Sequence, residues 1–417
     1  MTTAATPPRE PSPDRVIELA AELVAIDTQN PPGDTRTLAA WIESFFEAHG
    51  IAVKRVATDP AKPNLVATVP GRSERTLLYN GHMDTVPFDA DEWHYDPLGE
   101  RVDDRLYGRG ATDMKGPLAA MLSTAERVAA ADREPPLTLA FAVVSDEETG
   151  GAAGVSTLVE SGGLDDLAPE ACVIGETTCS AGRHSVTVAD RGSIWLTLEA
   201  TGTAAHGSRP MSGENAIDRL WAAISTLRRR LPARDLAFDA DTAAVVDESV
   251  DYYAPTLGRA AARDLFEHPT VNLGELSGGS GINTVPCSAT ARLDIRVTAG
   301  VDTADILADI RDCLADHPAV SIDDVSWSVG TVEPVDSPLV AAVTSVADSV
   351  IDERIYRRSA TGGGDAKTFR HAGVPTVEFA VGTDTVHAVD EYTTVDALQR
   401  TAAVYDRLPA ALAEHSS

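Results

Sequence analysis

Residues 76–84 of the chain, TLLYNGHMD, form an apolar run that ends on His82 and Asp84. The run has the length and composition of a buried β-strand, and the two polar residues come where the strand ends. Side chains two residues apart in an extended chain point the same way, so both should project from the carboxyl end of the strand, where open α/β sheets bind ligands. His82 can then bind a metal ion while Asp84 orients its ring. Taken alone the pair is weak evidence, because a single histidine is more often packed in a core or exposed on a surface.

Similar apolar runs occur on both sides of this stretch and alternate with helical patterns. Before residue 186 these are NLVATV at 64–69, the helical GPLAAMLSTAERVAAA at 116–131, LTLAFAVVSDE at 137–147 and ACVIGE at 171–176. Beyond residue 330 they are the helical PLVAAVTSVADSVID at 338–352 and VPTVEFA at 374–380. The alternation predicts an α/β domain, a mixed sheet with helices on both faces, made of residues 1–185 and 331–417.

Residues 186–330 follow a different order, strand–helix–strand–strand–helix–strand. The elements are SIWLTLEATG, NAIDRLWAAISTLRRR, TVNLGELSG, ATARLDIRV, TADILADIRDCLAD and SIDDVSWSVG. This order is that of the ferredoxin-like unit, with residues 231–269 expected to be an irregular insertion. A chain of 417 residues exceeds what one core usually supports, so we expect this small domain to be inserted into the larger one.

The charge balance is strongly acidic. The chain has 64 acidic and 34 basic residues, a net charge of −30, and its lysines are only Lys54, Lys62, Lys115 and Lys367. This argues against a nucleic-acid partner. Such a charge destabilises a compact protein by self-repulsion unless concentrated salt screens it. Because arginine also replaces lysine almost wholly, we favour a halophilic protein over an ordinary acidic cytosolic enzyme.

Other features of the sequence point to the cytoplasm. No apolar run approaches the length that spans a bilayer, so no membrane partner is expected. The first fourteen residues, MTTAATPPREPSPD, are a proline-rich polar tail without the features of a signal peptide. The cysteines lack the spacing of a disulfide framework or a thiolate zinc site and are expected to be buried thiols; they are Cys172, Cys179, Cys287 and Cys313.

Further side chains able to bind metal follow the other predicted strands. Glu147, Glu148, Glu176 and His387 each come at or after the end of an apolar run. Asp113 lies in the glycine-rich loop GRGATDMKG before a helix, where an aspartate is more often a helix cap. The carboxyl ends of such strands meet along one edge of a sheet, so the convergence favours one shared metal site over coincidence.

The number and type of these ligands indicate the metal chemistry. Two histidines and three carboxylates without a thiolate suit Zn²⁺, with Co²⁺ or Mn²⁺ as substitutes. The set is too large for one catalytic zinc with an open position and fits two divalent ions bridged by a carboxylate. The adjacent carboxylates of Glu147 and Glu148 repel each other unless a cation or proton intervenes, which favours a division of labour between a base and a ligand.

Five motifs resemble the metallohydrolase family that contains acetylornithine deacetylase, succinyl-diaminopimelate desuccinylase, aminoacylase and glutamate carboxypeptidase. They occur in the family's order over nearly the whole chain: GHMDTVP at 81–87, YGRGATDMKG at 107–116, SDEETGG at 145–151, GET at 175–177 and HAVDE at 387–391. The resemblance implies two metal sites that share the bridging Asp113, one completed by His82 and Glu176, the other by Glu148 and His387. It also implies a cis peptide bond between Asp113 and Met114.

The resemblance also assigns roles outside the metal ligands. Glu147 is the general base, which takes a proton from the metal-bridging water and passes it to the leaving amine. The inserted domain is similar to the family's lid and dimerisation domain, so a homodimer is expected, with His206 in TAAHGSRP reaching an active site. The groups that resemble a substrate-carboxylate site are Arg191, Asn283, Arg292, Gly363 and Gly364.

The sequence thus predicts a hydrolase that cleaves an amide bond in a small N-acylated amino acid. The loop TGGGD at 361–365 departs from the TSGGTSD typical of desuccinylases, which argues against succinyl-diaminopimelate as substrate. A dipeptidase or carboxypeptidase with the same site is the alternative. A third possibility is a non-catalytic metal- or substrate-binding relative, but Glu147 and Asp84 are unnecessary for binding alone.

The net charge of −30 leads to a prediction about salt. We expect folding to require molar salt, because counterions must screen the repulsion between carboxylates. Thermal melts in dilute buffer and in concentrated KCl measure this directly. Equal melting temperatures in the two solutions would contradict the halophilic interpretation.

Overall fold

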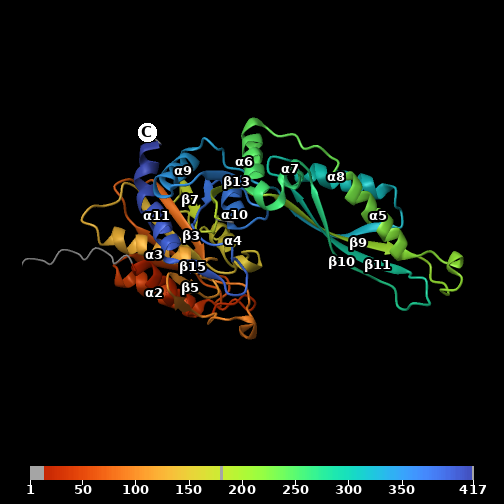
Figure 1. Ribbon diagram of the computed structural model, residues 1–417, viewed down its shortest axis with the longest axis horizontal. Coiled ribbons are helices and arrows are strands. Elements are labelled where there is room, and N and C mark those ends of the chain that lie inside the picture. The colour runs from red at the N-terminus through yellow and green to blue at the C-terminus, as the bar shows by residue number, and fades with distance from the viewer. Residues whose placement is uncertain (1–13, 179–181, 416–417) are drawn as a thin grey trace, which may run out of the picture. The chain divides into compact units, whose positions relative to one another are not determined.

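A computed structural model describes residues 14–178 and 182–415 (Figure 1). The chain forms two compact units: the first contains the chain up to Val188, Glu333–Arg357 and the chain from Gly364, and the second contains Ala189–Val332 with Arg358–Gly363. The short segment 358–363 was expected in the first unit. It belongs to the second because the Ser359 N–H donates to Ser249 Oγ (2.9 Å) and the Ala360 N–H to the Ala189 carbonyl (2.7 Å). Most of the proline-rich tail and Cys179 lie outside the described residues.

The first unit is built on an eight-stranded mixed sheet, as predicted. Its order is β1-β2-β6-β3-β7-β14-β8-β13. Strand β3 pairs in parallel with both β6 and β7, and β14 pairs in parallel with β7, whereas β2 is antiparallel to β6. The strands are β1 (Ala52–Val56), β2 (Asn64–Val69), β3 (Thr76–His82), β6 (Thr138–Val144), β7 (Ala171–Ile174), β8 (His184–Ala189), β13 (Ile355–Ser359) and β14 (Thr376–Glu378).

The two faces of this sheet carry side chains of different size. On one face Phe141 stacks on Tyr79, with ring centroids 5.5 Å apart, and Tyr79 in turn contacts Tyr405. The hydroxyls of Tyr79 and Tyr405 both donate to backbone carbonyls, so each of these buried hydroxyls has a hydrogen-bond partner. On the other face, α4 (Val155–Glu160) and α10 (Asp365–His371) pack on smaller side chains such as Ala140 and Ala142. The other helices of this unit are α1 (Arg15–Val24), α2 (Arg36–Ala48), α3 (Lys115–Ala129), α9 (Pro338–Val350) and α11 (Val395–His415).

The parallel strands end together along one edge. His82 is the last residue of β3, Glu147 comes three residues after β6, and Glu176 two residues after β7. A three-stranded sheet beside this edge was not predicted: β4 (Glu100–Val102), β5 (Arg105–Tyr107) and β15 (Tyr392–Thr394), in the order β15-β5-β4. It pairs Tyr107 with Tyr392 and so brings the loop that leads to Asp113 alongside the HAVDE segment.

The second unit has the predicted ferredoxin-like order. Its antiparallel sheet runs β10-β11-β9-β12, and α5 and α8 pack on one face over a continuous apolar core. The elements are β9 (Gly192–Thr201), α5 (Ala216–Arg230), β10 (Thr270–Gly278), β11 (Ser288–Val297), α8 (Thr303–Ala315) and β12 (Val320–Ser328).

The expectation that residues 231–269 are irregular is wrong. They contain two helices, α6 (Ala240–Leu257) and α7 (Arg259–Glu267), separated by Gly258 at φ +83°. The helices bury Val246, Val250 and Phe266 in a small cluster of their own. The cysteine prediction is also wrong in part, since Cys172 and Cys313 are buried but Cys287 is exposed. No helix in the described parts of the chain is long and apolar enough to cross a membrane.

Candidate active site

Asp113 lies between two histidines at the carboxyl edge of the large sheet. Its Oδ1 is 3.3 Å from His82 Nε2, and its Oδ2 is 3.2 Å from His387 Nε2. Each histidine meets a second carboxylate, Glu176 Oε1 at 3.3 Å from His82 and Glu148 Oε2 at 3.2 Å from His387. Asp113 therefore offers one oxygen to each of two histidine–glutamate pairs.

The donor atoms of these side chains fit divalent metal ions. Ligand atoms of His82, Asp113 and Glu148 all lie within 4.8 Å of one another, as do those of His82, Glu147 and Glu176. Carboxylates packed this closely repel one another unless a cation lies among them. Imidazole nitrogen and carboxylate oxygen are ligands of zinc and of similar divalent ions. Among the described residues, Asp113, Glu148 and Glu176 each form an ion pair with at least one of the two histidines, whereas Glu147 does not.

His82 is oriented by the backbone and not by the carboxylate that the sequence suggested. Its Nδ1 lies 2.9 Å from the carbonyl oxygen of Asp84, whereas the nearest carboxylate oxygen of Asp84 is 3.7 Å away. A carbonyl only accepts, so Nδ1 carries a proton and Nε2 faces Asp113. The Asp84 carboxylate instead accepts the backbone N–H groups of Glu147 and Glu148, each at 3.2 Å. Asp84 thus fixes the turn that carries the predicted base.

The Glu147 side chain also has a close neighbour in the glycine-rich loop. A Cβ placed on Gly364 would lie 3.0 Å from Glu147 Oε1, closer than ordinary van der Waals contact. Gly364 is extended, with φ −143°, so its backbone conformation does not require glycine. Glycine at this position leaves room for the Glu147 carboxylate.

Two of the other predicted site residues lie side by side in the second unit. The Gly207 N–H donates to the Asn283 carbonyl at 2.6 Å, and His206 forms a β-bridge with Thr284. His206 Nδ1 accepts the Ser208 N–H at 3.1 Å, so its Nε2 carries the proton in the neutral ring. The exposed ring can therefore donate a hydrogen bond from Nε2.

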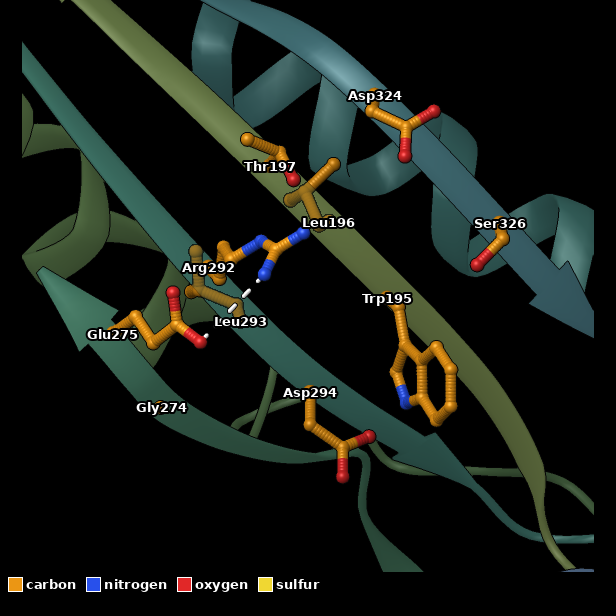
Figure 2. Close-up of a pocket in the computed structure, with 10 residues that line it drawn as sticks. All are labelled: Trp195, Leu196, Thr197, Gly274, Glu275, Arg292, Leu293, Asp294, Asp324 and Ser326. Atoms are coloured by element: carbon orange, nitrogen blue, oxygen red, sulfur yellow. Dashed lines mark ion pairs between the residues drawn. The ribbon is translucent and has the colours of Figure 1, made fainter. Parts of the chain in front are cut away.

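Arg191 and Arg292, both predicted substrate-binding residues, already have partners within the second unit. Arg191 is buried, and its guanidinium donates to Thr270 Oγ1 (3.2 Å) and the Arg296 carbonyl (2.9 Å). Figure 2 shows Arg292 on the outer face of the antiparallel sheet, where it pairs with Glu275 at 3.6 Å beside Trp195. Gly363 belongs to the second unit and Gly364 to the first.

Two residues that contact the site escaped sequence reasoning. Asn30 is buried, and its Nδ2 donates to Asp84 Oδ2 (2.8 Å) and Asp146 Oδ1 (3.1 Å). Glu391 accepts the backbone N–H of Asp113 at 3.1 Å. Asn30 lies in the loop TQNPPGD, which carries no metal-binding signal, but Glu391 ends the HAVDE motif, and its proximity to His387 in sequence could have marked it.

Residues 78–411 match the model of peptidase family M20/M25/M40. The chain is a member of this family. It is 30% identical over 356 residues to succinyl-diaminopimelate desuccinylase of Acidiphilium cryptum, covering 83% of this chain and 85% of that protein. It is 27% identical over 388 residues to a probable succinyl-diaminopimelate desuccinylase of Staphylococcus epidermidis, covering 90% and 92%.

Solved structures of M20 members share the fold. An M20 metallo-carboxypeptidase of Sulfolobus solfataricus superposes with a TM-score of 0.79 at 19% identity, covering 96% of this chain and all of that one. A dinuclear metal-binding M20 peptidase of Bacillus subtilis gives 0.66 at 15% identity, covering 96% and 98%. The prediction of a metallohydrolase that acts on amide bonds is confirmed at the level of the family.

In this M20 protein, hydrogen bonding and burial raise the pKa values of four side chains in the cluster. Hydrogen bonds to Asp113 and Glu148 raise the pKa of His387 to about 10. Burial, together with the charge of Asp113, raises the pKa of Glu176 to about 8. Burial opposes a charge on His82, but its hydrogen bonds to Asp113 and Glu176 outweigh this and raise its pKa well above the ordinary value. Burial likewise raises the pKa of Glu147.

These pKa shifts lead to a prediction about metal uptake. With pKa values of about 8 and about 10, Glu176 and His387 hold protons at pH 7 before metal binds, and ligation must displace them, so these two groups should release about two protons per subunit. The affinity for metal should therefore rise with pH. It should rise first as Glu176 loses its proton near its pKa of about 8, and further as the pH approaches the pKa of His387, about 10. Calorimetric titration of Zn²⁺ in buffers of different ionisation enthalpy counts the protons. Glu176→Gln should release about one fewer, and a binding enthalpy independent of the buffer would refute the assignment.

Proposed function

We propose that this chain is a di-metal hydrolase that cleaves the amide bond of small N-acylated amino acids. The observation that carries the proposal is Asp113, whose two oxygens face two separate histidine–glutamate pairs. One ion would be held by Asp113, His82 and Glu176, and the other by Asp113, Glu148 and His387. Zn²⁺ suits these ligands best, with Co²⁺ or Mn²⁺ as substitutes.

In this mechanism the chain's own residues position the substrate and move one proton. Divalent ions held by these ligands would supply Lewis acidity towards the scissile carbonyl and the attacking water. Glu147 accepts the proton of that water on its carboxylate and later donates it to the leaving amine nitrogen. The hydrogen bonds from the Glu147 and Glu148 backbone to Asp84 keep the base in place during both transfers. The raised pKa of Glu147 suits a group that must both take up and release a proton.

The substrate assignment rests on two sets of relatives. The desuccinylases named above act on N-acylated amino acids, which supports a deacylase. Peptidase activity is the second candidate, since the solved structures that share the fold include a carboxypeptidase and a tripeptidase. Asn283, whose backbone adjoins that of His206, is the proposed contact for the substrate carboxylate, whereas Arg191 and Arg292 have partners within the second unit. Gly363 and Gly364 would contribute through their backbone.

The base and ligand roles can be separated by mutation. Glu147→Ala should lower kcat by about 10²–10⁴-fold, the usual contribution of a general base, with metal content near two ions per subunit. Glu148→Ala should instead lose metal, and Glu170→Ala, which removes a half-buried ion pair with Arg75, should change neither. The assays are metal analysis and hydrolysis of N-acetyl and N-succinyl amino acids and of dipeptides. No hydrolysis of any of these by fully loaded wild-type protein would refute the function.

We further propose a homodimer formed through the second unit. Trp221 on α5 and Leu276 on β10 are 49% and 44% exposed, and Met211 and Ile282 in nearby loops are more exposed still. Large apolar side chains this exposed support an interface on the second unit. Strand β10 is also an edge strand, with backbone groups free to pair.

In such a dimer His206 would act on the partner's substrate. Its Nε2–H is free to donate to the carbonyl oxygen as the amide becomes tetrahedral. Mixing Glu147→Ala with His206→Ala, both inactive alone, should restore roughly a quarter of wild-type activity after subunit exchange, because half the dimers are mixed and half their sites are intact. If His206 works within its own subunit, every site keeps a lesion and the mixture stays inactive.

A further inference from the structure

Glu391 is a buried carboxylate next to the metal cluster that is not one of its ligands. Its Oε1 accepts the backbone N–H groups of Thr112 (2.9 Å) and Asp113 (3.1 Å), and its Oε2 accepts Arg109 Nη1 (2.6 Å). Its backbone carbonyl accepts the Gly108 N–H at 2.9 Å. Both carboxylate oxygens are thus taken by donors, and all of these donors lie in the loop 108–113.

Arg109 connects this loop to the segment that carries His387. Its Nη1 binds Glu391, and its Nη2 lies 3.4 Å from the His387 carbonyl oxygen. The HAVDE segment leads directly into β15, whose Tyr392 pairs with Tyr107 immediately before the loop. The two segments therefore run side by side, joined by the strand pairing at one end and by the Arg109–Glu391 pair nearer the metal cluster.

Burying the Arg109–Glu391 ion pair costs desolvation free energy, so its presence in the interior requires an explanation. Arg109 is 4% exposed and Glu391 is fully buried, and removing two charges from water costs several kcal/mol per ion unless hydrogen bonds satisfy them. An apolar pair of similar volume often stabilises a fold equally well or better. A role in stability alone therefore explains the pair less well than a need for geometry.

The geometry at stake is that of Asp113. Its carboxylate must present Oδ1 to the His82 side and Oδ2 to the His387 side, so a small rotation of its backbone weakens contact with one of them. The Glu391 carboxylate accepts a hydrogen bond from the Asp113 N–H, and Arg109 donates to the backbone carbonyl of His387. Other hydrogen bonds hold the His82 side. His82 Nδ1 donates to the Asp84 carbonyl, and the Thr177 hydroxyl donates to the Thr112 carbonyl.

We propose that the buried Arg109–Glu391 pair is a positioning device that holds Asp113 and His387 in register. The metal position of Asp113, Glu148 and His387 then depends on the pair, whereas that of Asp113, His82 and Glu176 largely does not. The proposal rests on the two-ion function above. It adds that the two positions differ in what maintains them.

The test is Glu391→Gln, which keeps the size of the side chain but sets an amide against Arg109. The metal-free protein is titrated with Co²⁺, followed by calorimetry and by the visible spectrum, and metal content is measured after dialysis. Loss of such an outer partner typically weakens metal binding about 10–100-fold, and here that loss should fall on one ion only. The variant should retain about one ion per subunit and regain kcat at high Co²⁺ with KM unchanged.

Asp406→Asn is the matched control. Asp406 is another largely buried carboxylate of the first unit that pairs with an arginine, Arg127, and accepts the Thr124 hydroxyl, but it contacts no proposed ligand. This variant should lose stability yet bind both ions like wild type. If Glu391→Gln also binds both ions with unchanged affinity, the pair serves the fold alone and the proposal is wrong.

Arg109→Lys provides a second test that does not depend on the folding of Glu391→Gln. It keeps the charge opposite Glu391 but gives up the second contact, with the His387 carbonyl, so it should weaken the same ion and leave the other unchanged. Equal weakening of both ions in both variants would also overturn the asymmetry. A wild-type protein that binds fewer than two ions would instead refute the two-ion function, so the two failures are distinguishable.

Discussion

The repulsion between carboxylates at one sheet edge is the constraint on which this structure depends. Asp113, Glu147, Glu148 and Glu176 crowd around two histidines, of which His82 is buried and the His387 side chain is 49% exposed, and burial or hydrogen bonding raises the pKa values of Glu147, Glu176 and His387. A flexible chain would relieve the repulsion by moving apart. The fold must therefore hold these side chains rigidly, so that binding a cation is the most favourable way to relieve the repulsion between the carboxylates.

Neutral backbone donors supply much of that rigidity. The Asp84 carboxylate is held by the N–H groups of Glu147 and Glu148, and Glu391 by those of Thr112 and Asp113. Backbone N–H groups stabilise a carboxylate without adding a mobile charge that would compete with a metal ion. The cationic partners, Lys62 on Asp146 and Arg109 on Glu391, bind carboxylates that are not proposed ligands. Positive charge in the protein thus supports the cluster from outside and leaves its centre for the metal.

The sequence predicted the features that long periodic patterns encode. Apolar runs such as TLLYNGH and LTLAFAVV became parallel neighbours, and the inserted βαββαβ order holds. Strands β4, β5 and β15 have three residues each, too few for a period to show, although they bring Asp113 and His387 together. Helices α6 and α7 were missed because Pro255 and Gly258, which usually end helices, fall among them. The orientation of His82 by a backbone carbonyl was unpredictable in principle, since every residue has a carbonyl.

The same geometry limits where substrate selectivity can arise. The groups around Asp113 act on water and on the amide, which every candidate substrate shares, so they cannot distinguish one acyl group from another. Gly364 also adjoins the base, since a Cβ at this position would lie 3.0 Å from Glu147 Oε1 and would require a small shift of that carboxylate. Within the loop TGGGD, residues 361–363 belong to the second unit, as do His206 and Asn283. Selectivity is thus expected to change with the second unit while the chemistry of the first stays constant.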